Sequence, residues 1–199
     1  MLSVSEIQRL IAELAFRERI LVELDVGTGL RMSELFALKW SDVDFQTNEI
    51  SVTRSIVMQV IGPCKTEASQ KPIPLDPYLA EILQAWRRCA RYGALDDWVF
   101  ANPDSGGRKP YWGQSLLRKF LRPIAIKLGI PRFGWHAFRH TYSTLLRATN
   151  ADIKVMQELL RHTSSRVTLD TYMQSITSNK RKAQSEMVRL LRASNIKAG

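Results

Sequence analysis

The sequence contains few cysteines and no long apolar run. Cys64 and Cys89 are the two cysteines in 199 residues, too few for a disulfide framework, and they form no Cys-x-x-Cys pair. No run approaches the roughly 18 apolar residues of a membrane span. Met1 is followed by Leu-Ser-Val-Ser-Glu, which lacks the basic and apolar segments of a signal peptide. We therefore expect a cytoplasmic protein of a reducing compartment with no membrane partner.

Acidic residues are also scarce relative to basic ones. Lys and Arg total 29 and Asp and Glu total 19, which leaves a net charge of +10. An excess of this size favours a polyanionic partner such as nucleic acid. With 45% hydrophobic and 24% charged residues, the chain has the composition of a globular domain and excludes a disordered chain or a coiled-coil rod.

The hydrophobic pattern predicts a mainly α fold with a small antiparallel β-sheet (α+β). Ser3 and Glu6 have the spacing of a capping box before an amphipathic helix. Pro77 suits the first turn of a later helix, and Pro123 is expected to kink or end another. Further helices are expected over 19–26, 33–38, 77–91 and, with breaks near 150 and 163–165, over 136–191. Strands are expected over 49–53, 55–61 and 71–75, with a turn starting at 62–63 and a loop at 102–110.

Two basic side chains stand at turns. Arg31 follows Gly27-Thr28-Gly29-Leu30 at the start of a helix, where a guanidinium and free helix-start amides would favour a phosphate. Lys65 lies in the turn between two expected strands and could reach into a groove. Taken alone, each is better explained as a solvated surface residue.

The three histidines invite a zinc interpretation. His136, Arg139 and His140 have the spacing of one helix face, and His162 is the third histidine. Three histidines could hold a catalytic zinc. Against this, Arg139 would repel a cation on the same face, and Ala137 stands where a His-Glu-x-x-His motif needs Glu. We therefore expect no metal site.

Tyr172 completes a set of reactive side chains. It lies in a segment that Ser164 or Ser165 could cap as a helix, where a tyrosine is commonly a packing residue. Two arginines, two histidines, a lysine and a tyrosine together, however, are the inventory for metal-free phosphodiester chemistry.

These residues resemble the motifs of one family, the tyrosine recombinases or phage integrases. The segments that carry the resemblance are Thr28-Gly29-Leu30-Arg31-Met32-Ser33-Glu34-Leu35 with Leu38 to Asp44, Lys65-Thr66 with Ile73-Pro74-Leu75, His136-Ala137-Phe138-Arg139-His140-Thr141, Leu160-Arg161-His162, and Tyr172. They occur in family order. The resemblance implies the fold of that family's catalytic domain and metal-free DNA strand cleavage and rejoining through a 3′-phosphotyrosine.

The resemblance also implies roles for the residues. Tyr172 is the nucleophile, and the scissile phosphate is bound by Arg31, Arg139 and His162. His136 is the general base, Lys65 the general acid, and Glu34 a supporting residue, with no cofactor. Lys71 is a rival to Lys65, which is preferred for its Lys-Thr context.

The sequence departs from the family at Arg161, where glycine is usual before the distal histidine. An arginine there would change the local turn or add a phosphate contact. We expect residues 1–176 to form the catalytic domain and residues 177–199 a tail that docks in trans through Met187, Leu190 and Leu191. The family's N-terminal core-binding domain has no counterpart in the sequence, so we expect the catalytic domain alone.

The expected partners are double-stranded DNA and further copies of the chain in a DNA-bound homotetramer. Two alternatives remain open. One is a topoisomerase-like relaxing enzyme that shares the phosphotyrosine step. The other is a non-catalytic DNA-binding or docking module of the same fold.

Overall fold

The structure is a computed structural model that describes residues 1–63, 71–149 and 151–161. Its helices are α1 (Val4–Glu13), α2 (Phe16–Thr28), α3 (Met32–Leu35), α4 (Pro77–Cys89), α5 (Gly113–Leu116), α6 (Arg122–Lys127), α7 (His136–Ala148) and α8 (Ile153–Leu159). Its strands are β1 (Val43–Asp44), β2 (Glu49–Ile50), β3 (Arg54–Val57), β4 (Val60–Pro63) and β5 (Ile73–Pro74). Short 3₁₀ segments are η1 (Trp40–Asp42) and η3 (Pro103–Ser105), and η4 (Leu117–Leu121) is π-helical. The expected mainly α fold with small antiparallel sheets is confirmed.

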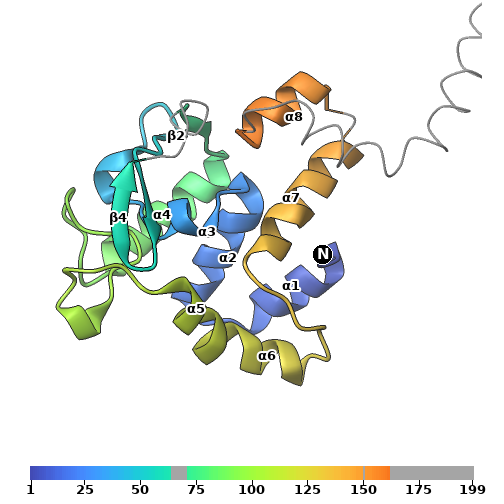
Figure 1. The fold of residues 1–199 in the computed structure, drawn as a ribbon, viewed down its shortest axis with the longest axis horizontal. Coiled ribbons are helices and arrows are strands. Elements are labelled where there is room, and N and C mark those ends of the chain that lie inside the picture. Colours follow the sequence, from blue (N-terminus) through green and yellow to red (C-terminus); the bar gives the residue numbers. More distant parts are fainter. Residues whose placement is uncertain (64–70, 150, 162–199) are drawn as a thin grey trace, which may run out of the picture.

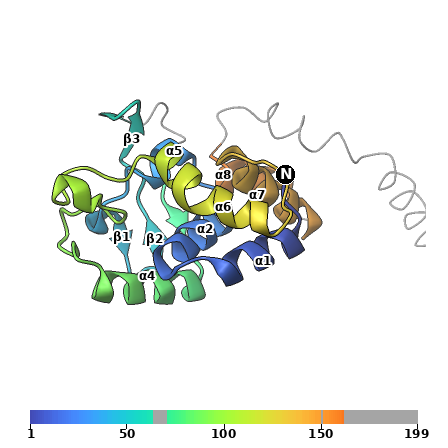
Figure 2. The same cartoon turned by 90° about the horizontal axis from the view of Figure 1, so that it is seen from below.

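Helix α2 lies at the centre of the arrangement and contacts α1, α4 and α7. The strands lie on one side of it and α7 and α8 on the other (Figure 1). Seen from below, the β3–β4 hairpin projects at the side of the molecule opposite α4 (Figure 2). The turn between α2 and α3 is therefore surrounded by elements from both halves of the chain.

The start of α1 follows the expected capping box. The Ser3 hydroxyl accepts from the Glu6 amide at 3.2 Å, and the Glu6 carboxylate accepts from the Ser3 amide at 2.7 Å. Helix α2 begins at Phe16, three residues earlier than the pattern predicts, and its N-cap Ala15 makes no side-chain bond. The helix therefore starts without a side-chain cap, on the backbone bond from the Arg19 amide to the Ala15 carbonyl at 2.9 Å.

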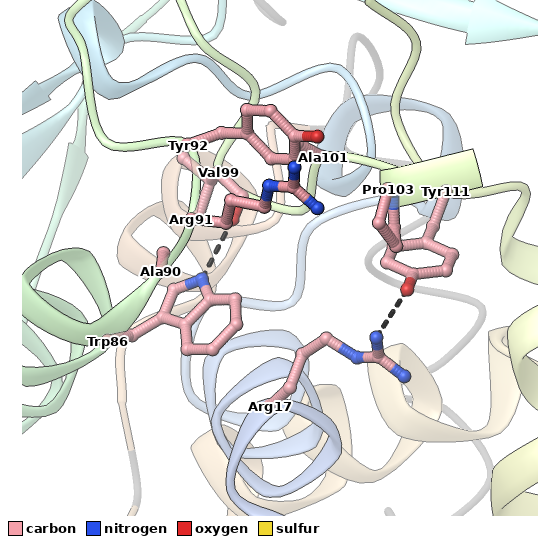
Figure 3. A pocket seen from close by; sticks show the side chains of 9 residues that line it. All are labelled: Arg17, Trp86, Ala90, Arg91, Tyr92, Val99, Ala101, Pro103 and Tyr111. Carbon is pink, nitrogen blue, oxygen red and sulfur yellow. Dashed lines mark hydrogen bonds between the residues drawn. The ribbon is translucent and has the colours of Figure 1, made fainter. Parts of the chain in front are cut away.

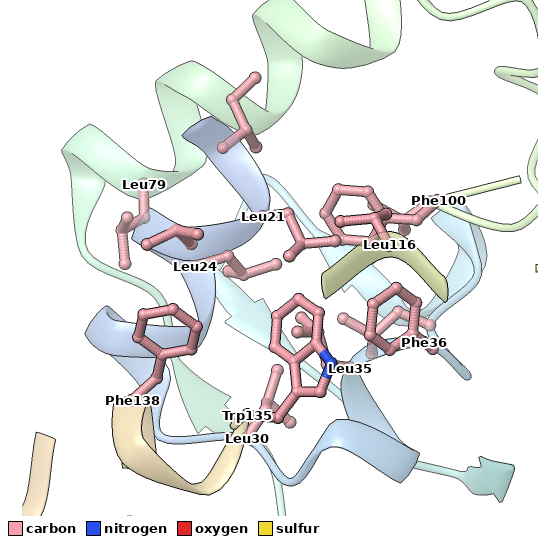
Figure 4. Close-up of a cluster of buried hydrophobic side chains, with 14 of the residues drawn as sticks. Leu21, Leu24, Leu30, Leu35, Phe36, Leu79, Phe100, Leu116, Trp135 and Phe138 are labelled. Carbon is pink, nitrogen blue, oxygen red and sulfur yellow. The ribbon is translucent and has the colours of Figure 1, made fainter. Parts of the chain in front are cut away.

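The hydrophobic core joins α2 to the start of α7. Leu21 and Leu24 of α2 are fully buried, and Trp135 and Phe138 reach the same cluster from the first turn of α7 (Figure 4). The Trp135 ring lies 5.2 Å from that of Phe36 in an edge-to-face arrangement. Aromatic pairs of this kind add to the free energy of burying their surface. The core thus fixes α7 relative to the turn that follows α2.

The strands differ from the sequence prediction over residues 55–61. The chain turns back within this segment, so that β3 and β4 pair antiparallel with Val57 opposite Val60. Met58 and Gln59 form the turn with φ of 49° and 65°, the left-handed backbone of a two-residue hairpin. The prediction of a turn starting at residues 62–63 is wrong, because both lie in β4. The sequence lacks the Asn-Gly pair that signals such a turn.

The other three strands form a separate sheet in the order β1–β2–β5. Ile50 pairs with Val43 on one side and with Ile73 on the other. Pro123 does not end a helix, since it stands in the first turn of α6 directly after the π-helical segment. A wider π turn accommodates the missing proline amide without a break.

Candidate active site

Arg31 is held by the turn that connects α2 to α3. Helix α2 ends at Thr28, and its C-cap Gly29 has a left-handed φ of 61° and an amide that donates to the Asp25 carbonyl at 2.8 Å. The ring of Tyr142 from α7 covers this turn so closely that a Cβ at position 29 would lie 2.2 Å from it. Arg31 then caps α3. Because α3 has only four residues, its dipole adds little, and the guanidinium itself supplies the positive charge.

Glu34 fixes Arg31 and joins it to a second arginine. Its Oε1 accepts from Arg31 Nη1 at 2.8 Å, and its Oε2 accepts from the Arg31 amide at 2.9 Å. The same Oε2 accepts from Arg161 Nη2 at 2.5 Å. Burial alone would raise the pKa of Glu34, but Arg161 and Arg31 together lower this pKa below its ordinary value. Glu34 is thus an ionised carboxylate shared by two guanidinium groups.

Arg139 connects the Arg31 turn to the end of α8. It is buried in α7, and its two terminal nitrogens donate to the carbonyl oxygens of Gly29 and Leu160. Burial and the nearby Arg31 lower the pKa of Arg139 to about 10. Arg139 therefore remains charged at neutral pH and holds together two segments that are distant in sequence.

Arg161 follows α8 with a φ of 50°. A non-glycine residue in this region costs about 1–3 kcal/mol, which explains why glycine suits the position. Arg161 thus adopts the left-handed backbone that glycine favours, and a change of the local turn stays a prediction. The side chain is 1% exposed and turned toward Glu34, so a direct phosphate contact by Arg161 is not what the structure favours.

Asp25 is a buried acid that the sequence reasoning missed. It is 1% exposed, and neither carboxylate oxygen has a hydrogen-bond partner among the described residues. Burial raises the pKa of Asp25 well above its ordinary value, although Arg139 opposes the shift. One signal was available in the sequence, since Asp25 lies at helical spacing from Leu21 and Thr28 on the buried face of α2.

The charges of the site are unequal. Three arginines surround Glu34, which is ionised. Asp25 is the second acid of the site, and its burial favours the neutral form. The Arg31 side chain is 36% exposed, whereas Arg139 and Arg161 are buried behind it. An approaching anion would meet Arg31 first, with the buried positive charges adding to its attraction. Bidentate guanidinium donors of this kind match a phosphate.

The two histidines of α7 lie apart from the buried arginine. His136 and His140 are exposed, and their ring centroids are 5.5 Å apart. Burial and the neighbouring His136 lower the pKa of His140. The two histidines share an exposed face, whereas Arg139 between them points into the domain. Within the described ranges, no three His, Cys, Asp or Glu side chains gather as metal ligands would.

Several expected site residues lie outside the described residues. These are Lys65, His162 and Tyr172, together with the tail over 177–199 that contains Met187, Leu190 and Leu191. Lys71, the rival to Lys65, is exposed and lies beside α8, where it lines a hollow of about 250 Å³ with Ile73, Glu158 and Leu159.

A second hollow lies at the far end of α2. It measures about 110 Å³ and is lined by aromatic and basic side chains that include Arg17, Trp86 and Tyr111 (Figure 3). The Arg17 guanidinium contacts the Glu18 carboxylate and the Tyr111 hydroxyl. Because Arg17 stands at the start of α2 and Arg31 follows its end, the length of the helix separates this hollow from the candidate site.

No described helix has the length and hydrophobicity needed to cross a membrane.

The sequence is similar to a family of known proteins over most of its length. The model of the phage integrase family matches residues 1–179. A "Tyrosine recombinase XerC-like" protein of Caldanaerobacter subterraneus subsp. tengcongensis is 30% identical over 187 residues, which are 84% of this chain and 48% of that protein. Tyrosine recombinase XerC of Mycobacterium leprae is 32% identical over 155 residues, 76% of this chain and 48% of its own. The chain spans about half the length of these relatives.

Solved structures show the same fold. The Tn1549 transposon integrase, in complex with circular intermediate DNA, superposes with a TM-score of 0.76 at 22% identity, covering 95% of this chain and 66% of that one. The XerA recombinase gives a TM-score of 0.67 at 25% identity and covers 94% of this chain and 62% of its own. The expected catalytic-domain fold is confirmed by these neighbours.

Proposed function

The chain belongs to the phage integrase family, and from this premise we propose that it cleaves and rejoins DNA at specific sites through a covalent phosphotyrosine. The observation that supports this most is the arginine cluster. Arg31 is fixed by Glu34 and partly exposed, and Arg139 lies buried behind it. The proteins named tyrosine recombinase among its relatives, and the DNA complex of its structural neighbour, favour the same chemistry.

The reaction requires no net change in the number of phosphodiester bonds. The Tyr172 hydroxyl attacks the scissile phosphorus, the bond from phosphorus to the 5′-oxygen breaks, and a 3′-phosphotyrosine and a 5′-hydroxyl result. Attack by a 5′-hydroxyl on the phosphotyrosine reverses the step and rejoins a strand. A phenol has a pKa of about 10, so cations beside the phosphate would assist its ionisation as well as stabilise the transition state.

Each remaining residue has one role in this proposal. Arg31, Arg139 and His162 would stabilise the charge on the non-bridging phosphate oxygens. His136 would accept the Tyr172 proton, and Lys65 would donate a proton to the leaving 5′-oxygen. Lys71 is the alternative donor, and comparing Lys65→Ala with Lys71→Ala on a substrate whose 5′-leaving group needs no proton would separate them. The lysine variant that this substrate rescues identifies the general acid.

The cationic side chains supply the charge stabilisation that metal ions give in many nucleases. We therefore expect cleavage to proceed in EDTA and without a nucleotide cofactor. Binding to double-stranded DNA should weaken steeply with salt, because each phosphate contact releases counterions.

The tail enters the proposal as an assembly element. Residues 1–176 would carry out the chemistry, and residues 177–199 would dock on a second copy in a DNA-bound tetramer through Met187, Leu190 and Leu191. Truncation after Ser178 should reduce the chain to smaller complexes on DNA in analytical ultracentrifugation. Unchanged assembly and activity would contradict this assignment.

The experiment that tests the function needs no known target. The protein is incubated in EDTA with a library of nicked duplexes and denatured in SDS, and covalent adducts are counted for the parent, Tyr172→Phe, Arg31→Ala and Arg88→Ala. Arg88 is exposed on α4 and serves as the control for loss of one positive charge. The parent and Arg88→Ala should form adducts, Tyr172→Phe none, and Arg31→Ala about 10²–10³ times more slowly.

Two outcomes would contradict the proposal. Salt-sensitive DNA binding without any adduct would favour the docking module. Adducts spread over the library without sequence preference would favour the relaxing enzyme.

A further inference from the structure

Arg161 combines three features that ordinarily disfavour an arginine. Its φ of 50° is left-handed, its side chain is 1% exposed, and its guanidinium lies in a cluster that already contains Arg31 and Arg139. A strained backbone and a buried charge persist only where the surrounding structure compensates for them. The compensating contact is the ion pair with Glu34 at 2.5 Å.

This ion pair changes the charge balance at Arg31. Glu34 accepts from Arg31 through both carboxylate oxygens, and Arg161 donates to one of the same oxygens. Without Arg161, Glu34 would pair one-to-one with Arg31 and offset its charge, and the positive charge nearby would be that of the buried Arg139. With Arg161 present, one carboxylate is shared between two cations, and the pair of arginines keeps a net positive charge.

Arg161 also contacts Arg31 through its backbone. Its carbonyl oxygen lies 3.5 Å from Arg31 Nη2, and the preceding carbonyl, of Leu160, accepts from Arg139. The left-handed turn at position 161 therefore presents two successive carbonyl groups to the two arginines. Arg161 thus contacts Arg31 directly through its backbone carbonyl and indirectly, by way of Glu34, through its side chain.

We propose that Arg161 is a positioning residue, which holds Arg31 through Glu34 in the geometry that binds the scissile phosphate and adds one positive charge to the cluster. The inference rests on the proposed function and concerns a residue to which the family resemblance assigns no role. Because the guanidinium is buried against Glu34, Arg161 acts through Arg31 and does not itself touch the DNA.

Removing the guanidinium has a consequence that a packing role would not have. The charged and titratable groups around Glu34 are Arg31, Arg161, Arg139 and Asp25. Without Arg161, Glu34 stays buried but loses one of the cations that favour its ionised form. The pH at which Glu34 takes up a proton should then rise, and the loss of activity toward acid should begin at a higher pH.

The test compares the parent with Arg161→Gly, Arg161→Lys and the control Arg88→Ala. Glycine removes the guanidinium and suits the left-handed backbone, so this variant should fold. Lysine restores the charge without the bidentate fork. Single-turnover adduct formation is measured on the nicked duplexes from pH 4.5 to 8, and the acid midpoint of unfolding is measured in parallel.

We expect Arg161→Gly to form adducts about 10 to 100 times more slowly at pH 7. The acid limb of its pH–rate profile, where the rate falls as the pH is lowered, should move to higher pH. Arg161→Lys should recover part of the rate, and Arg88→Ala should match the parent. An Arg161→Gly variant that reacts at the parental rate with an unmoved acid limb would overturn the inference while leaving the proposed function standing.

Failure of the proposed function gives a different result. If the parent itself forms no adduct, the function fails, and the acid midpoint of unfolding then decides the link between Arg161 and Glu34. A midpoint raised in Arg161→Gly would support that link, and a midpoint equal to the parent's would overturn this inference as well.

Discussion

Glu34 Oε2 lies 2.5 Å from Arg161 Nη2, across 127 residues of sequence. The other oxygen of the same carboxylate binds Arg31 at 2.8 Å. One acidic side chain therefore joins the turn after α2 to the residue that follows α8. The candidate site is assembled by this contact and by the parallel contacts of Arg139 with Gly29 and Leu160.

Replacing Glu34 by Gln should destabilise the fold. Two guanidinium groups would lose their shared counter-charge, and we expect a loss of about 3 kcal/mol, the lower end for a broken buried pair because Arg31 is partly exposed. Glu13→Gln is the matched control, since its ion pair with Lys127 is exposed and should matter little. Urea unfolding at pH 7 measures both, and equal effects would contradict the account.

The same variant should change the acid dependence of stability. The pKa of Glu34 is lowered in the folded state, so its contribution is present above the unfolded pKa and is lost as the pH falls through the folded one. The difference in free energy of unfolding between the parent and Glu34→Gln should therefore become smaller below about pH 4.3, the ordinary pKa of Glu. Unfolding curves from pH 3 to 7 test this, and a constant gap would refute it.

Replacing Asp25 by Asn should have the opposite pH dependence. Burial raises the pKa of Asp25, so the parent loses stability as the pH rises from the unfolded pKa of about 3.9 toward the folded one. Asn cannot ionise. The free energy of unfolding of Asp25→Asn should therefore rise relative to that of the parent by about 1.4 kcal/mol for each pH unit in that window. Thermal unfolding of both proteins at pH 4 and pH 7 measures this change. A stability difference that stays constant, or that moves in favour of the parent as the pH rises, would contradict the prediction.

Replacing Gly29 by Ala should disrupt the Arg31 turn. Both Gly29 and Gly129 have positive φ, 61° and 67°, so Ala at either position carries the same backbone strain of about 1–2 kcal/mol. Only at Gly29 would the new Cβ meet the Tyr142 ring, at 2.2 Å, whereas nothing lies within 4 Å of one at Gly129. Melting temperatures of the two variants are compared. Gly29→Ala should lower the melting temperature clearly more than Gly129→Ala. Equal decreases would mean that Tyr142 does not fix the turn.

Replacing Arg139 by Lys should separate charge from geometry. The planar guanidinium donates to two carbonyl groups on different segments, which an ammonium on a flexible stem cannot reproduce. We expect adduct formation to fall by about 10² or more, while Arg88→Lys on α4 retains the parental rate. A fully active Arg139→Lys would show that charge alone is needed.

The local features of the fold could be predicted from the sequence. The capping box at Ser3 and Glu6 and the placement of Arg31 after a glycine turn depend on residues three or four positions apart, and both are present in the structure. The hairpin turn at Met58 and Gln59 was missed because neither residue belongs to the usual left-handed types.

The contacts that assemble the site could not be predicted in this way. Arg161 reaches Glu34 only after α7 has packed against α2 and α8 against α7, and sequence spacing carries no information on such a pair. The burial of Asp25 follows from the packing of α7 against α2, although its position on the apolar face was a signal. Arg161, which stands where glycine is usual in the family, is part of the cluster.

The most direct measurement identifies the residue that carries the DNA. Adducts formed in EDTA are digested with trypsin and nuclease, and the modified peptide is sequenced by mass spectrometry. The account predicts a nucleotide joined through its 3′-phosphate to Tyr172. Attachment at another residue, a requirement for added metal, or no adduct from protein that binds DNA would contradict it.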